Sequence, residues 1–260
     1  ASYDSKTYDV SSQELYPQAL AFKDDGTKMY VCGDQFNRIY QYSLSTAWDI
    51  STASYDSIYF GALSYTQGLW FKSDGTKMFT ARTTTDIINR YSLSTAWNVS
   101  TATIDAGSLN VSAKETNLVG VNLKPDGTEI YATGGASNTV HQYTMSTAYD
   151  LATASFTASY DVSAQESILY KSRFNSDGTK MFINGLTNDK VHQYSLSTAY
   201  NVTTASYDNI SFSFATQTAS PRGLCFKPDG SKMYTADVNG DVWQYTTEGT
   251  FTGSLRASVG

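Results

Sequence analysis

Charge of either sign is scarce in this sequence, and positive charge is the scarcer of the two. Only 16% of the 260 residues are charged, and 24 acidic against 18 basic side chains give a net charge of −6. No basic stripe offsets the repulsion of phosphate groups, which argues against nucleic acid and anionic membrane surfaces as partners. No apolar run approaches the roughly 20 residues of a membrane-spanning helix. The sequence therefore predicts neither a nucleic-acid-binding nor a membrane protein.

Cysteine and histidine are almost absent. The two cysteines, Cys32 and Cys225, are too few for a disulfide framework, and the two histidines belong to no Cys/His cluster. No loop has the dense acidic spacing of a calcium site, and neither a nucleophile elbow nor a phosphate-binding loop is present. The sequence predicts no metal, no cofactor and no catalytic residue, and it favours a protein that is not an enzyme.

The chain contains a repeat instead. The pattern Asp-Gly-Thr-Lys-Met-Tyr, or a close variant, occurs five times, with its glycine at positions 26, 75, 127, 178 and 230. Successive glycines are 49, 52, 51 and 52 residues apart. A nearly fixed period in this range is typical of repeat architectures, in which each period forms one structural unit.

Each period is predicted to form four short β-strands. In the first copy these are residues 19–22, residues 29–31, residues 39–44 and a strand that opens at Ala53. Asp25-Gly26 between the first two strands is a strong hairpin signal, because glycine adopts the positive φ of the turn. Four antiparallel strands per period of about 50 residues describe a propeller blade. The predicted fold is all-β, a five-bladed β-propeller.

The fifth copy lacks its fourth strand, and the start of the chain resembles the missing piece. Residues 1–4 read Ala-Ser-Tyr-Asp, as do residues 53–56 and 205–208. We expect the N-terminal strand to join the last blade and close the ring, with residues 250–252 as the alternative. The predicted single domain has blades at about 12–60, 61–110, 111–161, 162–212 and 213–247 plus 1–10, followed by a C-terminal tail at 248–260.

The repeat resembles two groups of known sequences. An apolar strand followed by Pro/Ser-Asp-Gly and Lys-Met-Tyr resembles the Asp-Gly-type propeller repeats of lactonase-like and YVTN-like families, over nearly the whole chain. The block at residues 41–53, Gln-Tyr-Ser-Leu-Ser-Thr-Ala-Trp-Asp-Ile-Ser-Thr-Ala, is similar to repeats of uncharacterised phage or marine environmental, tail-fibre-like proteins. The resemblance implies the propeller fold, and it implies no catalytic residue.

Glutamates recur in the loops that enter the innermost strands. Glu14, Glu115 and Glu166 each lie twelve residues before the glycine of the following turn. Carboxylates that converge on the axis from several blades would suit a glycosidase, which needs an acid and a nucleophile or base. Alternatively, duplication has copied one local role, in which each glutamate bonds nearby backbone amides.

A second candidate set breaks the repeat. The position just before the inner strand is occupied by Gln18, Gln67, Val119, Tyr170 and Arg222. A single site on the axis requires such asymmetry. Arg222 is the one cation of this row and could meet a carboxylate or sulfate. The candidate ligand-binding residues are therefore Glu14, Gln18, Gln67, Glu115, Glu166, Tyr170 and Arg222.

Aromatic residues also recur in the connection between the third and fourth strands. Trp48, Trp97, Tyr149 and Tyr200 are either platforms for sugar rings or fillers of the seams between blades. The predicted function is a monomeric, non-catalytic binding or display module for a carbohydrate or surface ligand, extracellular or on a virion. The alternatives are a glycoside hydrolase that uses the axial carboxylates and a purely structural spacer.

Overall fold

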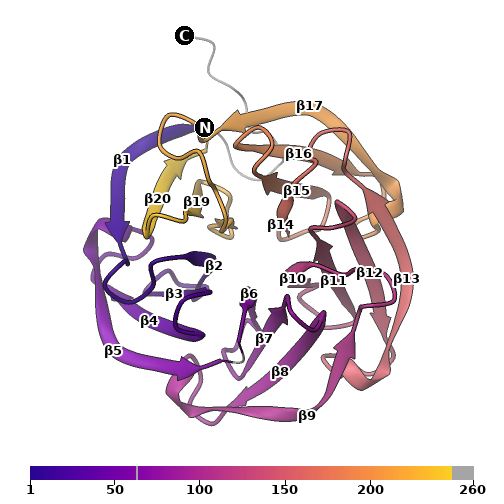
Figure 1. Cartoon of the computed structure of the whole chain (residues 1–260), viewed down its shortest axis with the longest axis horizontal. Helices are drawn as coiled ribbons and strands as arrows, with labels where there is room; N and C mark the ends of the chain where they lie inside the picture. Colours follow the sequence, from indigo (N-terminus) through magenta and orange to yellow (C-terminus); the bar gives the residue numbers. More distant parts are fainter. Residues whose placement is uncertain (63, 248–260) are drawn as a thin grey trace.

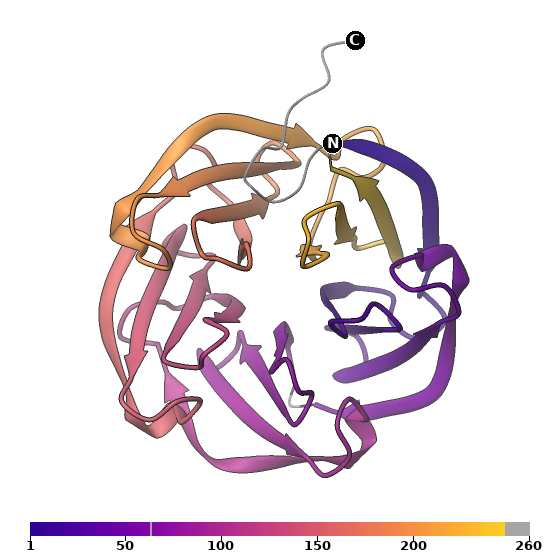
Figure 2. The ribbon, with the colours of Figure 1, turned by 180° about the vertical axis from the view of Figure 1, so that it is seen from behind.

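Five four-stranded antiparallel sheets stand around a central axis (Figures 1 and 2). The computed structural model describes residues 1–62 and 64–247. The prediction of an all-β, five-bladed propeller is confirmed. No helix in these described ranges is long and apolar enough to cross a membrane.

Each sheet runs from an inner strand at the axis to an outer strand at the rim. Blade 1 contains β2 (Pro17–Phe22), β3 (Lys28–Gly33), β4 (Arg38–Leu44) and β5 (Ala53–Gly61). Blade 2 contains β6 (Thr66–Phe71), β7 (Lys77–Arg82), β8 (Ile87–Leu93) and β9 (Ala102–Asn110). Blade 3 contains β10 (Leu118–Leu123), β11 (Glu129–Gly134), β12 (Thr139–Met145) and β13 (Ala154–Asp161). Blade 4 contains β14 (Leu169–Phe174), β15 (Lys180–Gly185), β16 (Lys190–Leu196) and β17 (Ala205–Ser213).

Blade 5 is assembled from both ends of the chain. It contains β18 (Cys225–Phe226), β19 (Lys232–Ala236), β20 (Asp241–Thr246) and, as its outer strand, β1 (Ser2–Asp9). Asp4 on β1 accepts hydrogen bonds from Lys232 Nζ at 2.6 Å and Gln244 Nε2 at 2.8 Å. The predicted closure by the N-terminal strand is confirmed, whereas residues 250–252 lie outside the described part of the chain.

The repeated Asp-Gly turn is held by contacts within its own blade. The Asp25 carboxylate accepts from the Thr27 backbone N–H at 3.0 Å and the Thr27 hydroxyl at 2.6 Å. Gly26 has φ +75°, and a Cβ there would lie 2.3 Å from the Trp48 ring. Glycine is therefore required both by the turn and by the ring above it, which explains the repetition without a metal or a catalytic role.

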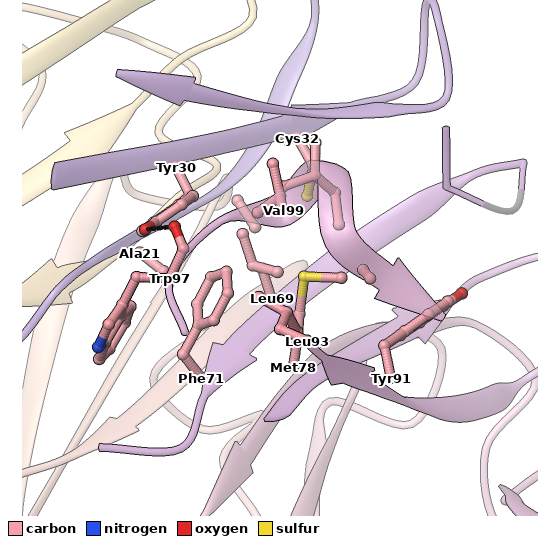
Figure 3. Packing of buried hydrophobic residues seen from close by; sticks show 13 residues of the cluster. Ala21, Tyr30, Cys32, Leu69, Phe71, Met78, Tyr91, Leu93, Trp97 and Val99 are labelled. Atoms are coloured by element: carbon pink, nitrogen blue, oxygen red, sulfur yellow. Dashed lines mark hydrogen bonds between the residues drawn. The ribbon is translucent and has the colours of Figure 1, made fainter. Parts of the chain in front are cut away.

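The seams between blades are filled by aromatic side chains and closed by a repeated hydrogen bond. Trp97, in the connection between β8 and the 3₁₀ helix η2 (Val99–Thr101), packs 5.5 Å from the Phe71 ring. Its backbone carbonyl accepts from the buried Tyr30 hydroxyl at 2.7 Å, as Figure 3 shows. The same bond joins Tyr131 to Tyr200 at 2.6 Å and Tyr234 to Trp48 at 2.7 Å. The recurring aromatics therefore act in the seams.

A glutamine on the third strand of a blade provides a second inter-blade contact. The side-chain oxygen of Gln41 accepts from the backbone N–H of Val99 at 3.2 Å. Two further blades repeat this bond, from Val202 to Gln142 at 3.1 Å and from Ile50 to Gln244 at 3.0 Å. Each bond satisfies a backbone donor at a helix start and connects neighbouring blades at the same point.

Candidate functional site

The first predicted glutamate, Glu14, ties together two loops of its own blade. Its side chain is fully buried. One carboxylate oxygen accepts from the backbone N–H groups of Tyr16 at 3.1 Å and Gln35 at 3.0 Å. The loop that enters β2 is thereby joined to the loop that follows β3.

Glu115 and Glu166 make the same connection in blades 3 and 4. Glu115 is 1% exposed and accepts from the backbone N–H of Asn117 at 2.7 Å and that of Ala136 at 3.1 Å. Glu166 is fully buried and accepts from the backbone N–H groups of two loop residues, Ile168 at 2.8 Å and Thr187 at 3.0 Å. All three glutamates therefore serve the local structure of separate blades.

The environment of Glu115 stabilises the ionised carboxylate. Burial by itself raises the pKa of Glu115, but hydrogen bonds from His141, Ser137 and the backbone outweigh it and lower the pKa to about 2. A general acid of a glycosidase needs a raised pKa instead. Glu115 is thus poorly suited to donate a proton near neutral pH.

The asymmetric row behaves differently, because its side chains reach across blades. Gln67, from blade 2, donates through Nε2 to Asp34 of blade 1 at 3.0 Å. The Arg222 guanidinium, from blade 5, lies 4.0 Å over the ring of Tyr170 in blade 4. These residues lie at or just before the starts of the inner strands β6, β14 and β18, and these strands surround the axis in Figure 1. The structure thus brings Gln67, Tyr170 and Arg222 into contacts that span neighbouring blades.

A lysine that the repeat pattern did not single out is buried beside this row. Lys171 on β14 is fully buried, donates through Nζ to the Val119 carbonyl at 2.7 Å and lies 5.4 Å from the Tyr170 ring. Burial, and to a lesser degree the charge of Arg173, lower the pKa of Lys171 to about 7. The repeat contained a signal for it: the equivalent positions are small, Ala19, Gly68, Gly120 and Gly223.

Asp34, directly after the second strand of blade 1, is another residue of this region that the repeat pattern did not single out. Burial raises the pKa of Asp34, although the hydrogen bond from Gln67 and the charge of Lys171 oppose this rise. At the equivalent positions the other blades have Thr83, Gly135, Leu186 and Val238. Because only one of the five copies has a carboxylate here, Asp34 is not part of the structure that all blades share.

Among the buried side-chain atoms that have no hydrogen-bond partner within the described residues, three belong to the asymmetric row or to Asp34. They are Gln18 Oε1, Asp34 Oδ1 and Arg222 Nε. Most buried polar groups in proteins are paired, so their presence together at one end of the channel is notable. We call the following side chains the axial cluster: Gln18, Asp34, Gln67, Tyr170, Lys171 and Arg222.

A metal centre is not visible in the described ranges, where no group of three or more His, Cys, Asp or Glu side chains could hold an ion. His141 instead lies 3.2 Å from the Ser137 hydroxyl and 3.7 Å from Glu115. His192 lies 3.3 Å from the Tyr207 hydroxyl. Both histidines contact groups within their own blade.

Comparison with known proteins supports the fold. No protein-family model matches the sequence, and no curated protein matches it. A solved structure from Bacteroides uniformis, named a "putative 6-phosphogluconolactonase", is 14% identical with a TM-score of 0.58, covering 94% of this chain and 69% of its own. A functionally unknown protein from Desulfotomaculum acetoxidans is 15% identical with a TM-score of 0.51, covering 93% and 68%. The chain is thus similar in fold to a lactonase-like propeller.

Proposed function

We propose that this protein is a non-catalytic binding module whose ligand enters the central channel at the axial cluster. One observation carries this proposal: Gln18 Oε1, Asp34 Oδ1 and Arg222 Nε are buried without partners. Each such group costs about 1–3 kcal/mol when its hydrogen bond is left unmade. A ligand that supplied the missing partners would recover this free energy on binding.

The chemistry of the three atoms favours a ligand rich in hydroxyl groups. Gln18 Oε1 and Asp34 Oδ1 accept hydrogen bonds, whereas Arg222 Nε donates one. A hydroxyl both donates and accepts, so neighbouring hydroxyls of a sugar can satisfy donors and acceptors together. We therefore propose a carbohydrate ligand, presented on a cell or virion surface.

Binding without hydrolysis is the version of this function that the site residues support. A glycosidase needs two carboxyl groups that flank the scissile bond. Asp34 is the one carboxylate of the axial cluster. Glu14, Glu115 and Glu166 each accept hydrogen bonds from backbone amides of their own blades, through Oε1 alone in Glu166. We therefore expect a bound sugar to be released without hydrolysis.

A pair of arginine variants tests the proposal. Arg222→Met removes the donor of the axial cluster, while Arg38→Met removes an arginine that lies at a similar 4.1 Å over the Tyr59 ring of blade 1. After a glycan array has identified a ligand, we expect calorimetry to show at least a tenfold weaker affinity for Arg222→Met and an unchanged affinity for Arg38→Met.

Two results would contradict the proposal. One is an array on which the wild-type protein binds no glycan, and the other is an equal loss of affinity in both variants. Incubation of each bound glycan with the protein, followed by mass spectrometry, separates the two classes of function: intact glycan supports a binding module, and cleaved glycan supports a hydrolase.

A further inference from the structure

The opposite end of the channel contains a cavity at the face of the Asp-Gly turns. Two adjoining spaces of about 280 and 170 Å³ share Asp24, Trp70 and Phe174 among their lining residues. All five inner strands, β2, β6, β10, β14 and β18, contribute to the smaller space. It therefore lies on the axis of the ring, at the end of the inner strands away from the axial cluster. We call the two spaces together the turn-face cavity.

A buried arginine lines the smaller space. Arg173 is 8% exposed and forms no ion pair with the described residues. Its Nη1 donates to the carbonyls of Ser172 at 3.1 Å and Val121 at 3.3 Å and to Asn122 Oδ1 at 3.2 Å. A buried charge without a counterion is costly, because neutral carbonyls do not replace the water and the ion that it has lost. An anion is the missing partner.

One edge of this guanidinium is available to an anion. Nη2 has a single long contact, 3.4 Å to the Leu69 carbonyl, and Nε has no acceptor among the described residues. Nε and Nη2 form the side-on edge of arginine, which binds the two oxygens of a carboxylate through parallel hydrogen bonds. The contacts made by Nη1 hold this edge in place. Arg173 is therefore already positioned for a carboxylate.

The walls of the cavity are partly aromatic and partly polar, and the polar lining residues include Ser73, Asn122, Asn175 and Lys227. Trp70, Phe71 and Phe174 supply aromatic walls to both spaces. Asp24 also lines both spaces and makes no hydrogen bond or ion pair with other described residues. A ligand with several negative charges would be repelled by Asp24, whereas a hydroxyl or N–H at the outer end would donate to it.

We propose that the turn-face cavity binds a small aromatic monocarboxylic acid, with its carboxylate on Arg173 and a hydrogen-bond donor directed to Asp24. The volume agrees with this class of ligand, since an apolar cavity of about 150 Å³ is sufficient for benzene. This site is separate from the axial cluster and does not depend on the carbohydrate proposal.

Arg173 is the only charged residue at its position in the five copies of the repeat. The equivalent positions in the other blades hold Ala21, Trp70, Asn122 and Cys225. Lys171 and Arg173 are two residues apart on one strand and therefore point to the same side. Blade 4 thus places a cation toward each end of the channel.

Calorimetric titration with 4-hydroxyphenylacetate tests the proposal on the unmodified protein. We expect measurable binding of the acid and at least a tenfold weaker interaction with 4-hydroxyphenylacetamide, which has the same shape and no charge. Phenylacetate, which lacks the hydroxyl donor, is expected to bind several-fold more weakly than the hydroxylated acid. Absence of binding, or equal binding of acid and amide, would overturn the proposal without any substitution.

Three variants locate the site. We expect Arg173→Met to lose at least tenfold in affinity for 4-hydroxyphenylacetate, and Asp24→Ala to abolish the preference over phenylacetate. Arg222→Met, at the other end of the channel, is expected to bind the acid as the wild type does. If Arg173→Met retains the wild-type melting temperature and affinity, the carboxylate is not held by Arg173 and the assignment fails.

Discussion

The seams between the blades contain a repeated hydrogen bond, whereas the axis of the ring contains side chains that differ from blade to blade. In the seams the same donor and acceptor pair recurs from blade to blade, as in the bond from Tyr30 to Trp97 at 2.7 Å. On the axis each blade contributes a different side chain, and Gln18, Asp34 and Arg222 each retain an unpaired buried atom.

This difference separates the residues that build the ring from those available to a ligand. A contact that recurs in several blades stabilises the whole circle, because every blade depends on its two neighbours. A buried group left unpaired lowers stability, and its presence is explained if another molecule completes it. The two cations of β14, Lys171 and Arg173, are the clearest departure from the repeat, since no other inner strand carries a cation at these two positions.

The largest effect is expected from breaking the seam that closes the ring. Deletion of residues 1–10 removes β1 and with it the contacts of Asp4 with Lys232 and Gln244. It also exposes the edge of β20, which other chains could then pair with. We expect loss of the cooperative thermal transition or formation of oligomers, measured by calorimetry and by light scattering after size exclusion. An unchanged melting temperature with monomeric elution would contradict ring closure as the main source of stability.

A substitution on the axis is expected to act in the opposite direction. The pKa of Lys171 is about 7 in the folded protein, compared with about 10.4 in an unfolded chain. Between these values the unfolded state binds more protons, so the contribution of Lys171 to stability rises with pH. Burying Lys171 thus lowers the free energy of unfolding most at low pH, and Lys171→Met removes this cost. We expect the variant to be more stable than the wild type at pH 7, by about 2 kcal/mol.

Urea denaturation of both proteins at pH 7 and pH 9 measures this effect. The advantage of Lys171→Met is expected to shrink as the pH rises. Parallel stability curves for the two proteins would show instead that Lys171 is charged and fully compensated in the folded state.

The smallest effect is expected from one seam hydrogen bond. Tyr30→Phe removes the donor to the Trp97 carbonyl and is expected to lower the free energy of unfolding by about 1 kcal/mol. Tyr245→Phe is a matched control, because the Tyr245 hydroxyl is buried and has no partner among the described residues. Chemical denaturation of both variants compares them directly. If Tyr245→Phe lowers the free energy of unfolding as much as Tyr30→Phe does, the hydrogen bond from Tyr30 to Trp97 does not explain the stability of the seam.

Much of the fold could be predicted because its causes are local. The Asp-Gly turn is held by residues two positions apart, such as Asp25 and Thr27, and strand alternation is visible in short windows. Ring closure could also be predicted, since the match between residues 1–4 and residues 53–56 identifies the N-terminal segment as the fourth strand of the last blade. The roles of Glu14, Glu115 and Glu166 remained open in the sequence, because a carboxylate that bonds local amides and one that faces a ligand look the same there.

The axial residues Asp34, Lys171 and Arg173 were missed for a different physical reason. Each makes contacts with other blades that the sequence does not reveal: Asp34 with Gln67, Lys171 with the Val119 carbonyl, and Arg173 with the carbonyls of Leu69 and Val121. A comparison of equivalent repeat positions marks these residues as exceptions. It does not reveal that they lie in one channel.

The five Asp-Gly-Thr-Lys-Met-Tyr turns, the four strands of each blade and the strand that closes the ring can be read from the amino-acid sequence, because turn chemistry and side-chain alternation act over a few residues. Only the tertiary structure decided that the glutamates support loops and that single side chains from different blades meet on the axis. Closing the ring brings inner strands that are about 50 residues apart in the chain together on the axis. Burial there leaves Gln18 Oε1, Asp34 Oδ1 and Arg222 Nε without partners among the described residues.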